Sequence, residues 1–138
     1  MCIELNKIEV SNKDIEVFKL FLIHEETGSL ASLFYTFNSH HGVGIGPVIL
    51  ENYNIKKDNS FNKGYGYHCF SSIILAEEYA THVFFPGYHK GTKVIRMTIP
   101  ERTRYSIGKI SHGYIGEGLL SIRAERLRYE GGKQSLNF

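Results

Sequence analysis

The chain of 138 residues has no tryptophan, only two cysteines and three prolines, and no long hydrophobic run. A membrane-spanning helix needs about 20 consecutive apolar residues, so we expect a protein that does not enter a membrane. The cysteines, Cys2 and Cys69, are too few and too far apart for a disulfide framework, which favours a reducing compartment. The N-terminus carries acids and lacks the basic and apolar regions of a signal peptide. These absences predict a cytoplasmic protein.

Arginine is missing from the first two-thirds of the chain. Residues 1–92 hold seven Lys and no Arg against ten acids, whereas residues 93–138 hold six Arg and three Lys against four acids. A guanidinium fork suits phosphate and carboxylate and stacks on rings, so this asymmetry indicates an anion site or, equally, a solvated charged sheet face. The net charge of +2 is too low for a strong polyanion binder, and we expect no strong nucleic-acid binding.

Short segments rich in β-branched and aromatic residues are typical of antiparallel strands. The predicted strands are residues 17–24, 30–37, 49–53, 65–70, 93–99 and 105–107, and the longest is 119–129. Residues 119–129 mix apolar and charged side chains on both sides of the strand, so the pattern assigns neither side to the core.

One segment, residues 71–82, has the pattern of a helix. Ser71 or Ser72 offers an N-cap, Leu75 and Tyr79 share one stripe, and two glutamates face water. A chain of this length fits one domain. We therefore predict a single α+β domain, mostly antiparallel sheet with one main helix.

The chemistry-bearing residues do not assemble into a catalytic or metal motif. None of the seven histidines has HxxxH or HExxH spacing, and we predict no metal and no cofactor. His68 and Cys69 are neighbours on a strand and face opposite sides, so we interpret both as core residues rather than a nucleophile pair. The glycine-rich residues 40–47 lack the phosphate-loop motif and stay a secondary anion candidate. The sequence therefore predicts a protein that is not an enzyme.

Residues 87–92 allow an alternative. ADP-ribosyltransferases often carry a His-Gly-Thr strand element that holds the NAD ribose. Here Lys90 interrupts this element, and only 46 residues after Thr92 remain for the rest of that fold. An NAD-dependent ADP-ribosyltransferase-like enzyme is therefore kept as an alternative.

Arginines and aromatic residues interleave in the second half of the chain, a combination that binds phosphates and stacks on bases. The predicted ligand-binding residues are Arg104, Arg123, Arg128, Arg126, Phe84, Phe85, Tyr88 and His89. The expected ligand is a small anionic nucleotide. We expect Arg→Ala changes at the first three positions to weaken binding with little effect on stability, as for exposed side chains.

Several short segments recur, in the same order, in a group of small proteins carried by phages and bacterial genomes. These segments are Met1-Cys2-Ile3, Val17-Phe18-Lys19-Leu20, Gly66–Phe70 with the helix after it, Val94–Pro100, Tyr105–Gly108 and Ala124–Leu127. With its size and late arginines, the chain resembles the viral anti-Thoeris sponges. Those proteins sequester an immune signal, a cyclic ADP-ribose isomer made from NAD, without degrading it.

The resemblance implies a phage protein that acts in the bacterial host cytoplasm. It also implies a homo-oligomer, because that family holds its ligand at subunit interfaces with arginines and aromatics. A phage inhibitor that binds a host protein is a further alternative.

Overall fold

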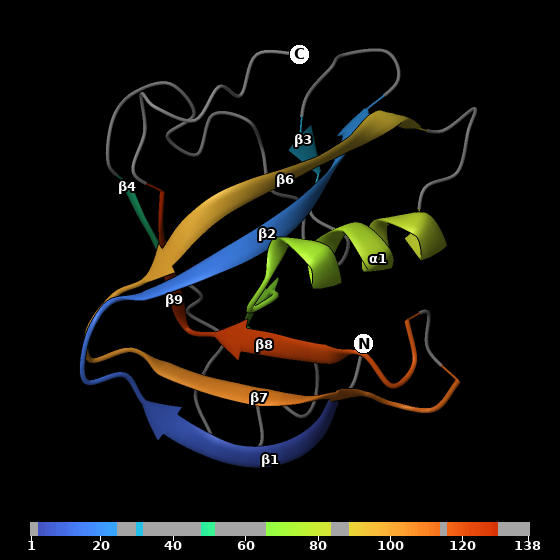
Figure 1. The fold of residues 1–138 in the computed structure, drawn as a ribbon. Helices are drawn as coiled ribbons and strands as arrows, with labels where there is room; N and C mark the ends of the chain where they lie inside the picture. The colour runs from blue at the N-terminus through green and yellow to red at the C-terminus, as the bar shows by residue number, and fades with distance from the viewer. Residues whose placement is uncertain are drawn as a thin grey trace.

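The computed structural model describes residues 3–24, 30–31, 48–51, 66–83, 89–113 and 116–129, which form two antiparallel sheets and one helix (Figure 1). The four-stranded sheet has the order β1 (Ile3–Val10), β7 (Arg104–Ile110), β8 (Leu120–Ala124) and β5 (Tyr67–Cys69). The five-stranded sheet has the order β3 (Leu30–Ala31), β2 (Ile15–His24), β6 (His89–Ile99), β9 (Arg126–Tyr129) and β4 (Val48–Glu51). Helix α1 is Ile73–Val83. The predicted α+β class with one main helix is confirmed.

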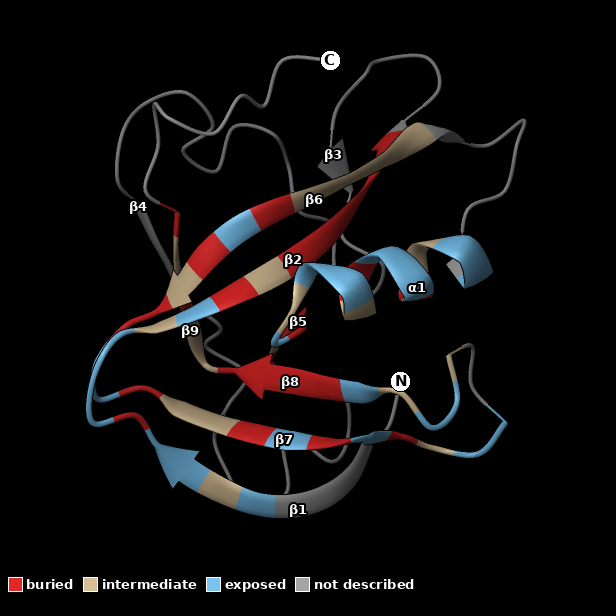
Figure 2. Cartoon of the chain, viewed as in Figure 1, coloured by how far each residue is buried: buried red, intermediate tan, exposed pale blue. Residues whose placement is uncertain are grey.

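The main hydrophobic core lies between the two sheets. Its buried members are Val17, Phe21, Ile23, Ile95, Met97, Ile99, Leu127 and Tyr129 of the larger sheet and Cys69, Ile122 and Ala124 of the smaller one. These residues are buried because every second residue of a strand points to the same face of its sheet. Figure 2 shows the described parts of β2 and β8 as buried over most of their length. Along β6, Ile95, Met97 and Ile99 alternate with the exposed Arg96 and so face this core.

The predicted single strand over residues 119–129 is wrong. The chain leaves one sheet after Ala124, and at Arg126 it enters the other, with Glu125 between them. Ile122 and Leu127 nevertheless lie in the same core cluster. The crossing explains the mixed pattern of this segment, because its two halves present opposite parities to one core.

Helix α1 begins where the sequence places its cap. The Ser72 hydroxyl accepts a hydrogen bond from the Leu75 backbone N–H at 3.2 Å, which satisfies one of the free donors of the first turn. Ala76 and Tyr79 are buried in a second core cluster that also contains Leu20 of β2. The helix therefore covers the face of β2 that points away from the main core (Figure 1).

Other strand predictions are confirmed within the described residues. Strands β2, β4, β5, β6 and β7 lie at or within a few residues of their predicted positions, and β3, from the predicted strand 30–37, pairs with β2. Residues 32–37 of the predicted partner strand and the glycine-rich residues 40–47 lie outside the described residues. In the part of the chain that is described, no helix is long and apolar enough to cross a membrane.

Candidate functional site

An open groove of about 610 Å³ runs between helix α1 and strand β6. Its size lies within the range of small-molecule sites, roughly 300–1,000 Å³. The residues that line it are Ile73, Glu77, Ala80 and Thr81 of the helix and Thr92, Lys93 and Val94 of the strand. The walls therefore combine apolar side chains with hydroxyls and one carboxylate, while Lys93 alternates with Thr92 and Val94 and so points its side chain to the other face of the sheet.

The strand wall follows from the alternation of β6. Thr92, Val94 and Arg96 share the face of the sheet that α1 covers. Val94 pairs with Leu20, and Arg96 pairs with Phe18. Leu20 belongs to the second core cluster, under the helix, and Val94 and Phe18 pack against that cluster. Arg96 follows Val94 by two residues, about 7 Å along the strand.

The helix wall follows from helical periodicity. Ile73, Glu77 and Thr81 are spaced four residues apart and so lie on one stripe, which borders the groove. The Thr81 hydroxyl donates a hydrogen bond to the Glu78 carbonyl at 2.7 Å, so its proton is directed back to the helix. Ile73 is 46% exposed, which leaves apolar surface at the groove edge.

Arg96 is the cation that the sequence interpretation missed. Its side chain is exposed, and it makes no hydrogen bond or ion pair with the residues that the structure describes. The alternation of residues 93–99 already separates Arg96 from the buried Ile95 and Met97. That signal could have placed Arg96 beside the groove only if the position of helix α1 over the sheet had also been known.

The predicted arginines lie elsewhere and contact other parts of the chain. Arg104 forms a fork with Glu125, with Nη2 at 3.1 Å from Oε1 and Nε at 3.2 Å from Oε2. Partial burial disfavours the charged form of Glu125, but the Arg104 guanidinium outweighs it and lowers the pKa of Glu125. The Glu125 backbone N–H also bonds to the Arg104 carbonyl at 2.9 Å. This pair therefore fixes the crossing between β8 and β9.

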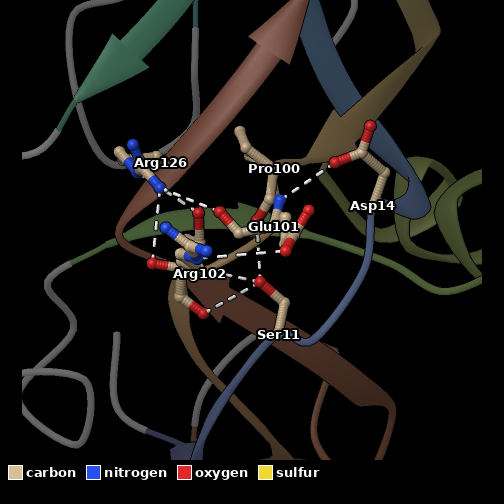
Figure 3. Close-up of polar contacts among 7 residues, drawn as sticks. Ser11, Asp14, Pro100, Glu101, Arg102 and Arg126 are labelled. Atoms are coloured by element: carbon tan, nitrogen blue, oxygen red, sulfur yellow. Dashed lines mark hydrogen bonds and ion pairs between the residues drawn. The ribbon is translucent and has the colours of Figure 1, made fainter.

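Arg126 and Arg128 hold the turns at one end of the sheets. Arg126 donates to the Thr103 hydroxyl at 3.2 Å and to the carbonyls of Glu101 and Arg102 at 3.1 and 3.3 Å (Figure 3). Arg128 forms an ion pair with Asp14 at 2.7 Å. Arg128 pairs with Thr98 of β6. Thr98 is six residues along that strand from Thr92, which lines the groove, so the two positions are about 20 Å apart.

The same turns are joined by backbone and hydroxyl contacts. The Ser11 hydroxyl donates to the Pro100 carbonyl at 2.7 Å and accepts from the Thr103 N–H at 2.9 Å. Asp14 accepts a further bond from the Glu101 N–H at 2.9 Å (Figure 3). The hydrogen bond from Arg128 and that from Glu101 lower the pKa of Asp14. The two arginines are therefore part of a structural network.

Arg123 is completely buried, at 0% exposure. It pairs with His68 of β5 and Ser106 of β7, so the three side chains share one face of the four-stranded sheet. The expectation that Arg123 is an exposed side chain with little effect on stability is therefore wrong. A buried charge contributes to the folded structure, and its loss is destabilising.

The aromatic part of the predicted site falls on the connection between the groove walls. Phe84, Phe85 and Tyr88 lie outside the described residues. His89 is the first residue of β6, and its side chain lies outside the described part. In sequence these residues join α1 to β6, whose facing surfaces form the groove.

A basic cluster is buried beside the main core. The Lys19 ammonium donates to the His68 carbonyl at 2.9 Å, which ties β2 to β5, and Lys19 is only 1% exposed. Burial lowers the pKa of Lys19 to about 8. Burial, then the charges of Arg123 and Lys19, hold the pKa of His68 well below its usual range. Burial raises the pKa of Cys69 to about 12, so its thiol is un-ionised at neutral pH.

The placement of His68 and Cys69 agrees with their interpretation as core residues. His68 lies against the rings of Phe70 and Tyr79, with centroids 4.9 and 5.4 Å away. Cys69 belongs to the inter-sheet core. Their side chains therefore face opposite sides of β5.

Metal ligation finds no support among the described residues, where no three His, Cys, Asp or Glu side chains could share one ion. Sequence and structure comparisons find no matching protein family, curated protein or solved structure.

Proposed function

We propose that the protein binds a small anionic nucleotide, a cyclic ADP-ribose isomer, and sequesters it without degrading it. The observation that carries this proposal is the groove between α1 and β6, whose volume of about 610 Å³ suits such a ligand. This location replaces Arg104, Arg123, Arg126 and Arg128 as the centre of the proposed site, since those four arginines are buried or bonded to other parts of the chain.

The chemistry of the walls supports a nucleotide. Arg96 follows Val94 on the face of β6 that α1 covers, so an exposed guanidinium lies next to the strand wall and can meet phosphates. Ile73 and Val94 offer apolar surface for a base. Glu77 on the opposite wall offers an acceptor for hydroxyl or amine groups.

The state of the buried groups supports retention rather than turnover. Cys69, the one described free thiol, has a pKa raised to about 12 and lies inside the core, away from the groove. A nucleophilic thiol needs access and a lowered pKa. A binding role needs neither.

A transferase is kept as the second candidate because of one observation. Thr92, the last residue of the His-Lys-Gly-Thr segment, lines the groove. If that segment acted as in ADP-ribosyltransferases, NAD would be consumed at the same place.

The experiment combines calorimetric titration with recovery of the ligand. Cyclic ADP-ribose and its available isomers are titrated into the purified protein, the complex is heated, and the supernatant is analysed by mass spectrometry. We expect intact ligand to be released, whereas a transferase would return nicotinamide from added NAD. Failure of every cyclic ADP-ribose isomer to bind at millimolar concentration would refute the proposal.

Arginine variants locate the site. Arg96→Gln should weaken binding roughly 10-fold or more, because a charge-assisted bond to phosphate contributes about 1.5–3 kcal/mol. Arg102→Gln is the matched control, since Arg102 is 86% exposed on the turn that follows β6, at the opposite end of that strand from Thr92. Light scattering with and without ligand tests the expected homo-oligomer in the same samples.

A further inference from the structure

The two walls of the groove differ in hydrogen-bonding character. The helix wall carries Glu77 and Thr81, and Arg96 follows Val94 of the strand wall on the same face of β6. A carboxylate only accepts hydrogen bonds, whereas a guanidinium only donates. The groove therefore presents acceptors on one side and has a cationic donor beside the other.

The helix wall is an acceptor surface because of where its protons go. Thr81 directs its hydroxyl proton to the Glu78 carbonyl at 2.7 Å, so its remaining lone pairs accept. Glu77 is exposed and makes no hydrogen bond or ion pair within the described part of the chain. Both groups are therefore available to donors of a ligand.

The carboxylate also limits what can occupy this wall. A phosphate placed against Glu77 would meet a like charge, which disfavours binding. A ligand with hydroxyl or amine donors there would gain a charge-assisted bond, which is stronger than a neutral one. The wall chemistry thus distinguishes the two ends of a bound molecule.

We infer that the ligand lies across the groove with a vicinal diol, such as that of a ribose, donating to Glu77, and with its anionic group toward the strand wall. This inference rests on the proposed nucleotide binding and adds the orientation and the requirement for hydroxyl donors. Carboxylates accept from ribose hydroxyls in dinucleotide-binding sites by the same chemistry. A site built to bond a hydroxyl rejects the analogue that lacks it, because the acceptor is left without a donor.

The test compares cyclic ADP-ribose with a deoxy analogue that lacks the hydroxyls of both of its riboses. Calorimetry measures both ligands against the full chain and against Glu77→Ala, Glu77→Gln and Glu78→Gln. Glu78 is the matched control, because it is the neighbouring exposed glutamate of α1 and does not line the groove. Circular dichroism and melting temperature confirm that each variant is folded.

We expect the parent protein and Glu78→Gln to bind the hydroxylated ligand roughly 10-fold more tightly than the deoxy analogue. Glu77→Ala should bind the two ligands equally, and Glu77→Gln should keep only part of the preference. Tight binding of both ligands with no preference would overturn the inference and leave the proposed function standing. An undiminished preference in Glu77→Ala would also overturn it, because the acceptor would then lie elsewhere. No binding of either ligand to the parent protein would refute both.

Discussion

The buried amine of Lys19 makes the stability of the fold depend on alkaline pH. Lys19 lies at 1% exposure between the sheets, and burial lowers its pKa from 10.5 to about 8. The folded state therefore releases this proton at a lower pH than the unfolded state does. Unfolding then binds a proton between these two values, and stability rises with pH through that window.

The size of the effect follows from the shift. Each pKa unit corresponds to 1.36 kcal/mol, so a shift from 10.5 to about 8 corresponds to about 3 kcal/mol in total. Most of it, about 2 kcal/mol, should develop between about pH 7 and pH 9.5. Below pH 8 both states are protonated, and the cost of burying the charge is present in full.

The assay is urea unfolding of the parent protein and of Lys19→Met over this pH range. The difference in unfolding free energy, parent minus variant, should rise by about 2 kcal/mol, because methionine has no proton to release. Burial raises the pKa of Cys69 and of Tyr79 to about 12, which lowers stability above pH 9, but both proteins share that loss. Lys13→Met, at an exposed position, is the control and should give a flat difference. A flat difference for Lys19→Met would refute the reasoning.

Three further predictions concern stability. Because the pKa of His68 is lowered on folding, its contribution to the free energy of unfolding is present in full above pH 6.5 and is lost as the pH falls below that value. The free energy of unfolding of His68→Phe, measured by denaturant titration at several pH values, should therefore fall less with acid than that of the parent protein. Ser72→Ala should cost about 1 kcal/mol through loss of the cap, measured as a lower melting temperature. Gly116→Ala should cost about 2–4 kcal/mol, because φ is +82° and the new Cβ would meet the Tyr79 ring at 2.4 Å. Gly113→Ala, at φ +86° with open space, should cost only about 1–2 kcal/mol, and equal losses would contradict the steric account.

The fold could be predicted where local periodicity agreed with tertiary burial. The β-branched and apolar residues 93–99 predicted the strand that became β6, and the cap at Ser71 or Ser72 predicted the start of α1. Both signals arise within a few residues, because strand and helix periods are set by backbone geometry. Long-range partners were not needed to read them.

The fold was missed where an irregularity shifts the period. Strand β1 was not predicted, and its pairing with β7 changes register between Leu5 and Lys7. After this shift Val10 is 61% exposed, so the apolar residues of this strand do not by themselves mark a buried face. The crossing at Glu125 hides the end of β8 in the same way. Which sheet each half joins depends on partners far away in the chain.

The candidate site shows the same limit at the level of single side chains. The excess of arginine after residue 92 indicated an anion site, but a guanidinium in a small domain also finds acceptors inside the chain. The partner of Arg128 is Asp14, separated by 114 positions, and no local pattern joins them. Arg96 differs because its pairing with Phe18 places it on the face beside α1, where it stays exposed. The position of the helix over β2 and β6, rather than the arginine content, therefore determines which exposed cation lies beside the groove.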